Sequence, residues 1–305
     1  MKKKKKKRIR AAYPARSTMD VTGALIRCAL ACSLFIVLAG ALSVSGAYAA
    51  LPEWASMLIQ TAVTLLCFGL PAVYGLFFAD GDQRDKLACQ ALSAEQLRWF
   101  ALVGVLLVSP MTLLSDLISA PLARMGVMTG GASAVPPFAL FLPMVVKSAL
   151  VAPVCEELFV RGYLPAALRA AESRFALLIS ALFFALVHGV GAAFLPMFLL
   201  GLLLGALVQR TDSLLAAVTV HAAYNLTVLV LSFAGLGGLF SGLGFLSCLI
   251  RVPLCALFVF VLKEACQARG ARKALRFGPP PTLRQMLMLA LALAALIVCP
   301  LLLAR

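Results

Sequence analysis

The residues most able to do chemistry in this sequence are ionisable side chains inside long apolar segments. The only two histidines of the chain, His188 and His221, lie in such segments, within F-A-L-V-H and H-A-A-Y-N. A third segment ends in E-E-L-F-V-R, which contains Glu156, Glu157 and Arg161. Ionisable groups are costly inside a bilayer and usually mark function, so these residues predict one buried site.

Three separate segments place these residues at a similar depth. Glu156 and His188 lie 13 and 14 residues from Arg169 and Arg174, the arginines of the connector between their segments. His221 lies 11 residues from the basic end of its own segment. At the rise of an α-helix these spacings correspond to roughly 20 Å for the first two residues and roughly 16 Å for His221. We therefore expect the three side chains to converge.

Spacing within each motif separates the roles of the side chains. Glu157 and Arg161 are four residues apart with the acid first, which favours a helical ion pair. Glu156 points about 100° away from Glu157, so it stays free to meet a water molecule. His221 and Asn225, also four residues apart, share one helix face. Their N–H groups could together stabilise an oxyanion.

Two neighbours of the glutamates are interpreted as structural. Pro153 has no backbone N–H, so it predicts a kink that frees a carbonyl group and leaves room for water. Cys155 points about 100° away from Glu156 on a helix, which favours a packing role. No serine or cysteine lies in a recognisable nucleophile motif.

The set of side chains suits the hydrolysis of an amide bond, in which a base activates water and N–H groups stabilise the tetrahedral oxyanion. Zinc is an alternative, because two histidines and a glutamate can bind it. The sequence has no H-E-x-x-H motif, however, and no short ligand spacing of that kind. We therefore expect neither a metal ion nor another cofactor.

Composition predicts the fold class. The 305 residues are 63% hydrophobic and only 13% charged, whereas soluble domains are near half apolar and a quarter charged. Apolar runs of about 20 residues must be helical in a bilayer. We expect an all-α transmembrane bundle of about 8–9 helices, forming one membrane domain over residues 21–305 behind a basic tail, residues 1–20. The predicted segments are 21–48, 55–79, 97–120, 137–160, 175–191, 193–209, 213–235, 240–262 and 285–303.

The net charge of +15 is concentrated in the amino-terminal tail and in alternate connectors. This bias predicts a cytoplasmic amino terminus, with the tail on anionic lipid headgroups, and argues against nucleic acid as a partner. The alanine- and leucine-rich composition favours a bacterial plasma membrane. Ala47-Tyr48-Ala49 resembles a signal-peptide cleavage site, but the apolar run before it is too long for that, so we expect an uncleaved first helix.

Four further ionisable residues fall within apolar segments. Arg27 and Arg251 are expected to extend toward the headgroups or to join helix contacts. Asp116 and Lys147 could pair with each other across two helices, which sequence alone does not decide. The nine cysteines are scattered singly and are interpreted as small buried apolar residues.

The three motifs resemble those of the CPBP family, also called the Abi family, which includes intramembrane CAAX proteases and bacteriocin-processing enzymes. The family pattern is E-E-x-x-x-R, then F-x-x-x-H, then H-x-x-x-N on separate helices. Every position matches, at Glu156 to Arg161, Phe184 to His188 and His221 to Asn225. The resemblance covers roughly residues 137–235, the motif-bearing core.

The resemblance implies a metal-independent glutamate-type endopeptidase that acts on a membrane-associated or lipidated peptide or precursor. By analogy with the family's prenyl proteases, Glu156 and His188 are expected to activate water. His221 and Asn225 are expected to form the oxyanion hole. Glu157 and Arg161 are expected to support the site.

Two other functions remain open at this point. A non-catalytic immunity or scaffold protein of the same fold could bind a membrane peptide without cutting it. A small proton-coupled transporter could use the glutamates and histidines as a relay, although no inverted repeat is visible.

Overall fold

The computed structural model describes residues 21–44, 46, 51–79, 88–125, 135–167, 173–189 and 192–267. Over these residues the fold is entirely helical, and the only β-type pairing is one isolated bridge between Cys89 and Ser213. Eight of the nine predicted segments are helical. The ninth, 285–303, lies outside the described residues, as does the basic tail.

Two of the eight helical rods are divided into several elements. The second rod contains α3 and α4, and the fourth contains α6, α7 and α8. The elements are α2 (Val21–Val44), α3 (Glu53–Thr64), α4 (Leu70–Tyr74), α5 (Ala94–Arg124), α6 (Phe141–Met144), α7 (Ala152–Glu157), α8 (Leu164–Ala167), α9 (Ser173–Val187), α10 (Phe194–Thr211), α11 (Leu214–Phe233) and α12 (Phe245–Gln267).

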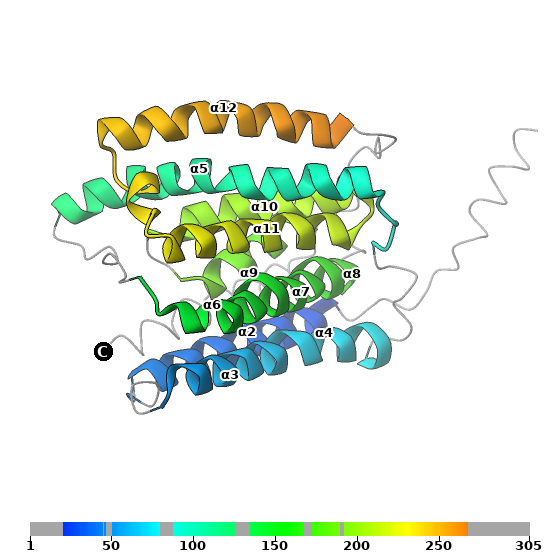
Figure 1. The fold of residues 1–305 in the computed structure, drawn as a ribbon. Helices are drawn as coiled ribbons and strands as arrows, with labels where there is room; N and C mark the ends of the chain where they lie inside the picture. The colour runs from blue at the N-terminus through cyan, green and yellow to red at the C-terminus, as the bar shows by residue number, and fades with distance from the viewer. Residues whose placement is uncertain are drawn as a thin grey trace, which may run out of the picture.

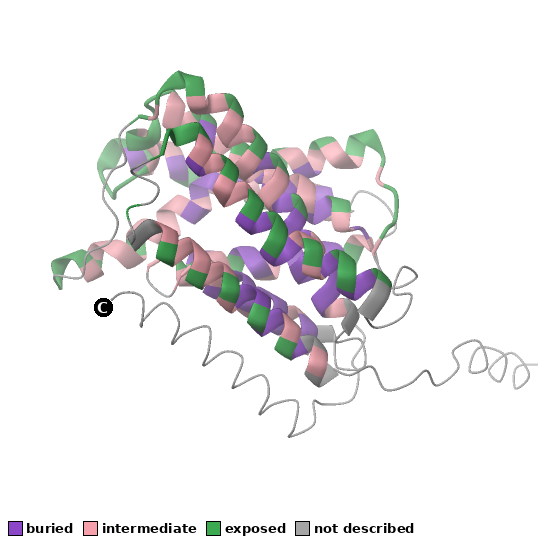
Figure 2. Ribbon diagram, turned by 90° about the horizontal axis from the view of Figure 1, so that it is seen from below, coloured by how far each residue is buried: buried purple, intermediate pink, exposed green. Residues whose placement is uncertain are grey.

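The rods lie roughly side by side in a layered bundle (Figure 1). Along one edge α5 packs on both α12 and α11, and α10 packs on α9 and α11. The rod of α6, α7 and α8 crosses the middle, and α2, α3 and α4 form the opposite edge. Buried residues line the interior of the bundle, while exposed residues concentrate on its outer faces and ends (Figure 2).

The fourth rod alternates between α-helix and the wider π-helix, whose hydrogen bonds join residues five apart. π-Helical stretches at Val145–Val151 and Leu158–Tyr163 lie on either side of α7, which carries the two glutamates. The Ala152 N–H bonds the carbonyl of Lys147, five residues earlier. The next bond of that kind would join Pro153 to Ser148, but proline has no N–H to donate. The Ser148 carbonyl is therefore free of the helix, as the position of Pro153 predicts.

Glycines allow close contact between helices next to this rod. A Cβ atom on Gly201 of α10 would lie 2.9 Å from the Cα of Ala181 on α9. One on Gly104 of α5 would lie 2.4 Å from the carbonyl oxygen of Val220 on α11. Membrane helices pack through such small residues because lipid supplies no hydrophobic force between them.

Within the described part of the chain, seven of the eight rods are long and apolar enough to cross a bilayer, so the chain is an integral, multi-pass membrane protein. The apolar part of α9, Phe175–Val187, is shorter than these. The predicted segment 175–191 therefore ends early, because Gly189 has a φ of +114° that a helix does not accommodate. The segment predicted to start at 240 begins at Phe245, since Gly242 (φ +73°) interrupts the chain before it.

The remaining intramembrane charges have other partners than the sequence suggested. Asp116 pairs with Arg251 at 2.6 Å, and Lys147 donates to the side-chain oxygen of Gln60. The suggested pair of Asp116 and Lys147 is therefore wrong. Which residues face each other across two helices depends on the rotation of each helix about its axis, and spacing along the sequence does not give that rotation. Arg251 is fully buried, and Arg27 donates to the hydroxyl of Tyr163 at 2.8 Å.

Candidate active site

A fully buried carboxylate, Glu157, lies at the centre of the polar cluster. Its Oε1 accepts hydrogen bonds from Arg161 Nη1 and from His221 Nδ1, each at 2.9 Å. The ion pair with Arg161 that the spacing predicts is therefore present. The bond to His221 was not predicted, and it joins the fourth rod to α11. Charge-assisted bonds of this kind are about twice as strong as neutral ones.

The Arg161 guanidinium makes contacts with two further helices. Its Nη2 donates to the backbone carbonyl of Gly201 on α10 at 3.2 Å. Its central carbon lies 4.3 Å from the ring centroid of Phe184 on α9, a cation–π contact of about 2 kcal/mol when desolvated. The close packing of α10 on α9 at Gly201 brings this carbonyl within reach.

The second carboxylate, Glu156, faces the other histidine. Its Oε2 lies 3.8 Å from His188 Nε2, which is too long for a direct hydrogen bond. Among the described residues nothing donates to this oxygen. The Glu156 and His188 side chains are 13% and 30% exposed, so this pair is more open than the buried Glu157 and Arg161.

The backbone determines which nitrogen of His188 carries a proton. Nδ1 lies 2.7 Å from the carbonyl oxygen of Phe184. Because a carbonyl oxygen only accepts, Nδ1 must donate, and in the neutral ring Nε2 is then an unprotonated acceptor directed toward Glu156. The carboxylate oxygen of Glu156 and the lone pair on His188 Nε2 therefore face each other across a gap of 3.8 Å.

Asn225 is held by the carbonyl group that Pro153 frees. Its Nδ2 donates to the Ser148 oxygen at 2.7 Å, which ties α11 to the π-helical turn before the glutamates. An amide nitrogen has two hydrogens, so one N–H remains after this bond. Pro153 thus helps to fix the side chain of Asn225 on the neighbouring helix α11, because it leaves the Ser148 carbonyl free to accept this bond.

The sequence singled out the six polar residues but did not predict the contacts of His221 with Glu157, of Asn225 with Ser148, or of Arg161 with Gly201 and Phe184. The structure brings Glu156 together with His188, and Glu157 together with Arg161 and His221. It places Asn225 on the Ser148 carbonyl, and it gives no bond between Asn225 and His221. Cys155 is buried, with its sulfur facing Gly69, in agreement with a packing role.

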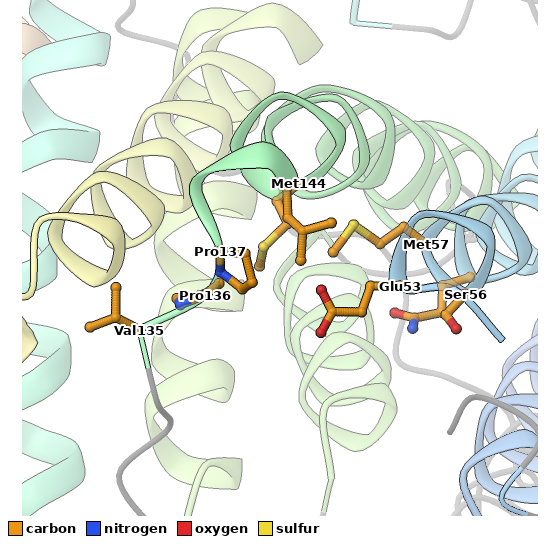
Figure 3. Close-up of a pocket in the computed structure, with 9 residues that line it drawn as sticks. Glu53, Ser56, Met57, Val135, Pro136, Pro137 and Met144 are labelled. Atoms are coloured by element: carbon orange, nitrogen blue, oxygen red, sulfur yellow. The ribbon is translucent and has the colours of Figure 1, made fainter. Parts of the chain in front are cut away.

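A separate cavity of about 460 Å³ lies at the opposite end of the fourth rod from α8, next to the start of α3 (Figure 3). Glu53, Met57 and Met144 point into it, and none of the six polar residues lines it. Within the described ranges, no three His, Cys, Asp or Glu side chains gather closely enough to hold a metal ion.

The structure brings two glutamates and two histidines from separate helical rods into one polar cluster, in which Glu157 and His221 are buried. These features define a membrane protein with an intramembrane polar site. Residues 138–227 match the family model of the Rce1-like type II CAAX prenyl endopeptidases, and this part of the chain is an Rce1-like domain. The match runs from the start of the fourth rod into α11 and includes all six polar residues. Comparison with the curated proteins and with the solved structures finds no match.

Proposed function

We propose that this protein is an intramembrane, metal-independent glutamate-type endopeptidase. The observation that carries the proposal is the pairing of an otherwise unbonded Glu156 oxygen with the unprotonated Nε2 of His188, 3.8 Å away. A general base must be within reach of the proton it removes, directly or through one water. A water molecule beside this gap can donate one hydrogen bond to the Glu156 oxygen and one to His188 Nε2.

The proposed reaction begins when a water molecule gives a proton to Glu156, while its oxygen forms a bond to the carbonyl carbon of the substrate. The π electrons of the carbonyl move to its oxygen and form an oxyanion. When the intermediate collapses, the C–N bond breaks and the leaving nitrogen takes the proton. His188 accepts a hydrogen bond from the water and orients it. The products are a carboxylic acid and an amine, and the acid then gives its proton to the amine or to the solvent.

Stabilisation of the oxyanion is assigned to His221 and Asn225. Asn225 retains one N–H after its bond to Ser148. His221 donates Nδ1–H to Glu157, so its Nε2 donates only when the ring is doubly protonated. The proposal requires that form during the reaction. Glu157 therefore has a larger part in the proposal than its pairing with Arg161 alone suggested.

The proposed substrate is a peptide bond in a membrane-associated or lipidated peptide or precursor. The proposed setting is a bacterial plasma membrane, with the amino terminus in the cytoplasm and the basic tail on anionic headgroups. The match to the prenyl endopeptidase family supports a peptide as substrate. The position of the glutamates on a rod of the membrane bundle supports a substrate that reaches them from the lipid phase.

The experiment that tests the proposal measures cleavage by the purified full chain, with prenylated CAAX peptides and double-glycine leader peptides as substrates. We expect one class to be cut by the wild type and not by Glu156→Gln. Glu53→Gln, which removes a carboxylate from the cavity of Figure 3, is the matched control and should keep activity. Equal cleavage by wild type and Glu156→Gln would refute the proposal, and loss in chelator would refute metal independence.

A further inference from the structure

The aromatic ring of Phe184 contacts all three elements of the polar cluster. Its centroid lies 4.5 Å from that of His188 and 5.6 Å from that of His221, the second in an edge-on arrangement with an interplanar angle of 76°. The Arg161 guanidinium covers the ring at 4.3 Å. The ring is 1% exposed and lies between side chains from the fourth rod, α9 and α11. The ring therefore contacts both the more open pair of Glu156 and His188, through His188, and the buried cluster of Glu157, Arg161 and His221, through the last two.

Each histidine has one hydrogen bond to a ring nitrogen, from His188 to the Phe184 carbonyl and from His221 to Glu157. One such bond fixes the position of one nitrogen but leaves the plane of the imidazole free to turn about it. A flat neighbour at packing distance removes that freedom. For both histidines the flat neighbour is the same ring.

We propose that Phe184 is the positioning residue of the site, which holds both imidazole planes and thereby directs both Nε2 atoms. This inference rests on the proposed function for its kinetic consequence. Its structural consequence is independent of it, because the orientation of the two rings is measurable without a substrate.

The chain offers a direct measurement, since His188 and His221 are its only histidines. ¹⁵N-histidine labelling of the full chain in lipid nanodiscs yields resonances from these two rings alone. Phe184→Met keeps an apolar side chain that adapts to a core but removes the flat ring. Phe184→Tyr keeps the ring. Phe183→Met is the matched control, because Phe183 is equally buried but points about 100° away on α9.

We expect wild type, Phe184→Tyr and Phe183→Met to show His188 as a single tautomer protonated on Nδ1. In Phe184→Met the imidazole should also turn away from the Phe184 carbonyl, so that the two ring nitrogens of His188 exchange the proton and their resonances move toward a common value. A single unchanged tautomer in folded Phe184→Met would overturn the proposal. If Phe184→Met does not fold, Phe184→Leu takes its place in the same comparison, with the same two outcomes.

The kinetic measurement separates this inference from the proposed function. With a cleaved peptide, Phe184→Met should lower kcat by about 10- to 100-fold, the scale of a misplaced catalytic group, and leave KM within about twofold. Phe183→Met should change neither. Equal kcat for the two methionine variants would overturn the positioning role. If the wild type cuts no peptide, the proposed function fails, and the tautomer of His188 still decides whether Phe184 orients the rings.

Discussion

One oxygen atom of Glu157 binds His221 Nδ1 at 2.9 Å, and the same atom receives the Arg161 guanidinium at 2.9 Å. The carboxylate therefore serves two donors from two helices while fully buried. Its neighbour Glu156 lies on the adjacent position of α7 and accepts no bond from the described side chains at Oε2. Two identical side chains, one residue apart, thus have different surroundings.

The two glutamates are expected to separate stability from activity. Glu157→Gln removes the charge that compensates a buried guanidinium, which should lower the free energy of unfolding by about 3–5 kcal/mol. Glu156→Gln breaks no hydrogen bond at Oε2, so its thermal unfolding midpoint should stay close to the wild type while peptide cleavage is lost. Thermal unfolding in detergent and a cleavage assay on both variants measure the two effects. Equal loss of stability in the two would contradict this account.

Pro153 is expected to act on Asn225 through the Ser148 carbonyl. Pro153→Ala restores an N–H that can bond this carbonyl within the helix and displace the Asn225 side chain. Cleavage should become slower with no loss of stability. A double-mutant cycle provides the check, since Asn225→Ala should cost much less activity in the Pro153→Ala background than in the wild type. Independent, additive effects would show that the two residues are not coupled.

Gly201 is expected to be intolerant of any side chain. A Cβ at this position meets the backbone of Ala181 at 2.9 Å, so Gly201→Ala should force α10 away from α9 and its carbonyl away from Arg161. Overpacking costs about 1–3 kcal/mol, and we expect a lower unfolding midpoint together with slower cleavage.

Gly205→Ala is the control for this prediction. There the new Cβ meets the end of the flexible Leu177 side chain, which can move aside. Gly205→Ala should therefore cost less stability and leave cleavage unchanged. A lower unfolding midpoint for Gly205→Ala than for Gly201→Ala would contradict the prediction that the backbone contact at Ala181 is the more restrictive of the two.

The pair of Asp116 and Arg251 is expected to stabilise the fold without affecting cleavage. Arg251 is fully buried and also donates to the carbonyl groups of Phe240 and Gly242, which both precede α12. Asp116→Asn leaves that guanidinium without a counter-charge, so the unfolding midpoint should fall. The cleavage rate at a temperature where the variant is folded should match the wild type. A selective loss of kcat would instead link this pair to the site.

The sequence was sufficient for the all-helical membrane fold, because apolar runs of this length have one stable form in lipid. It was also sufficient for the ion pair of Glu157 with Arg161, which depends only on spacing within a helix. Contacts between helices were harder, because they depend on the rotation of each rod. For this reason the sequence did not predict the bond from His221 to Glu157. It also suggested Lys147 as the partner of Asp116, whose partner in the structure is Arg251.

Helix ends and π-helical turns also exceeded what the sequence patterns could predict. Hydropathy alone does not show that α9 is shorter than α10, because Gly189 ends α9. It also does not show that α12 begins only after the turn at Gly242. The π-helical stretches around α7 have no residue signature of their own. In the stretch before α7, the Ser148 carbonyl that Pro153 leaves free is satisfied by Asn225 of the neighbouring helix α11.

The wide turns before α7 let the fourth rod absorb a change in the length of its chain. A π-helical turn has the room of one extra residue relative to an α-helix. Deletion of a single residue between Val145 and Val151 would let this stretch close to regular helix and keep the two halves of the rod close to their present rotation. A deletion in a regular α-helical part of the rod would instead turn one half by about 100° relative to the other.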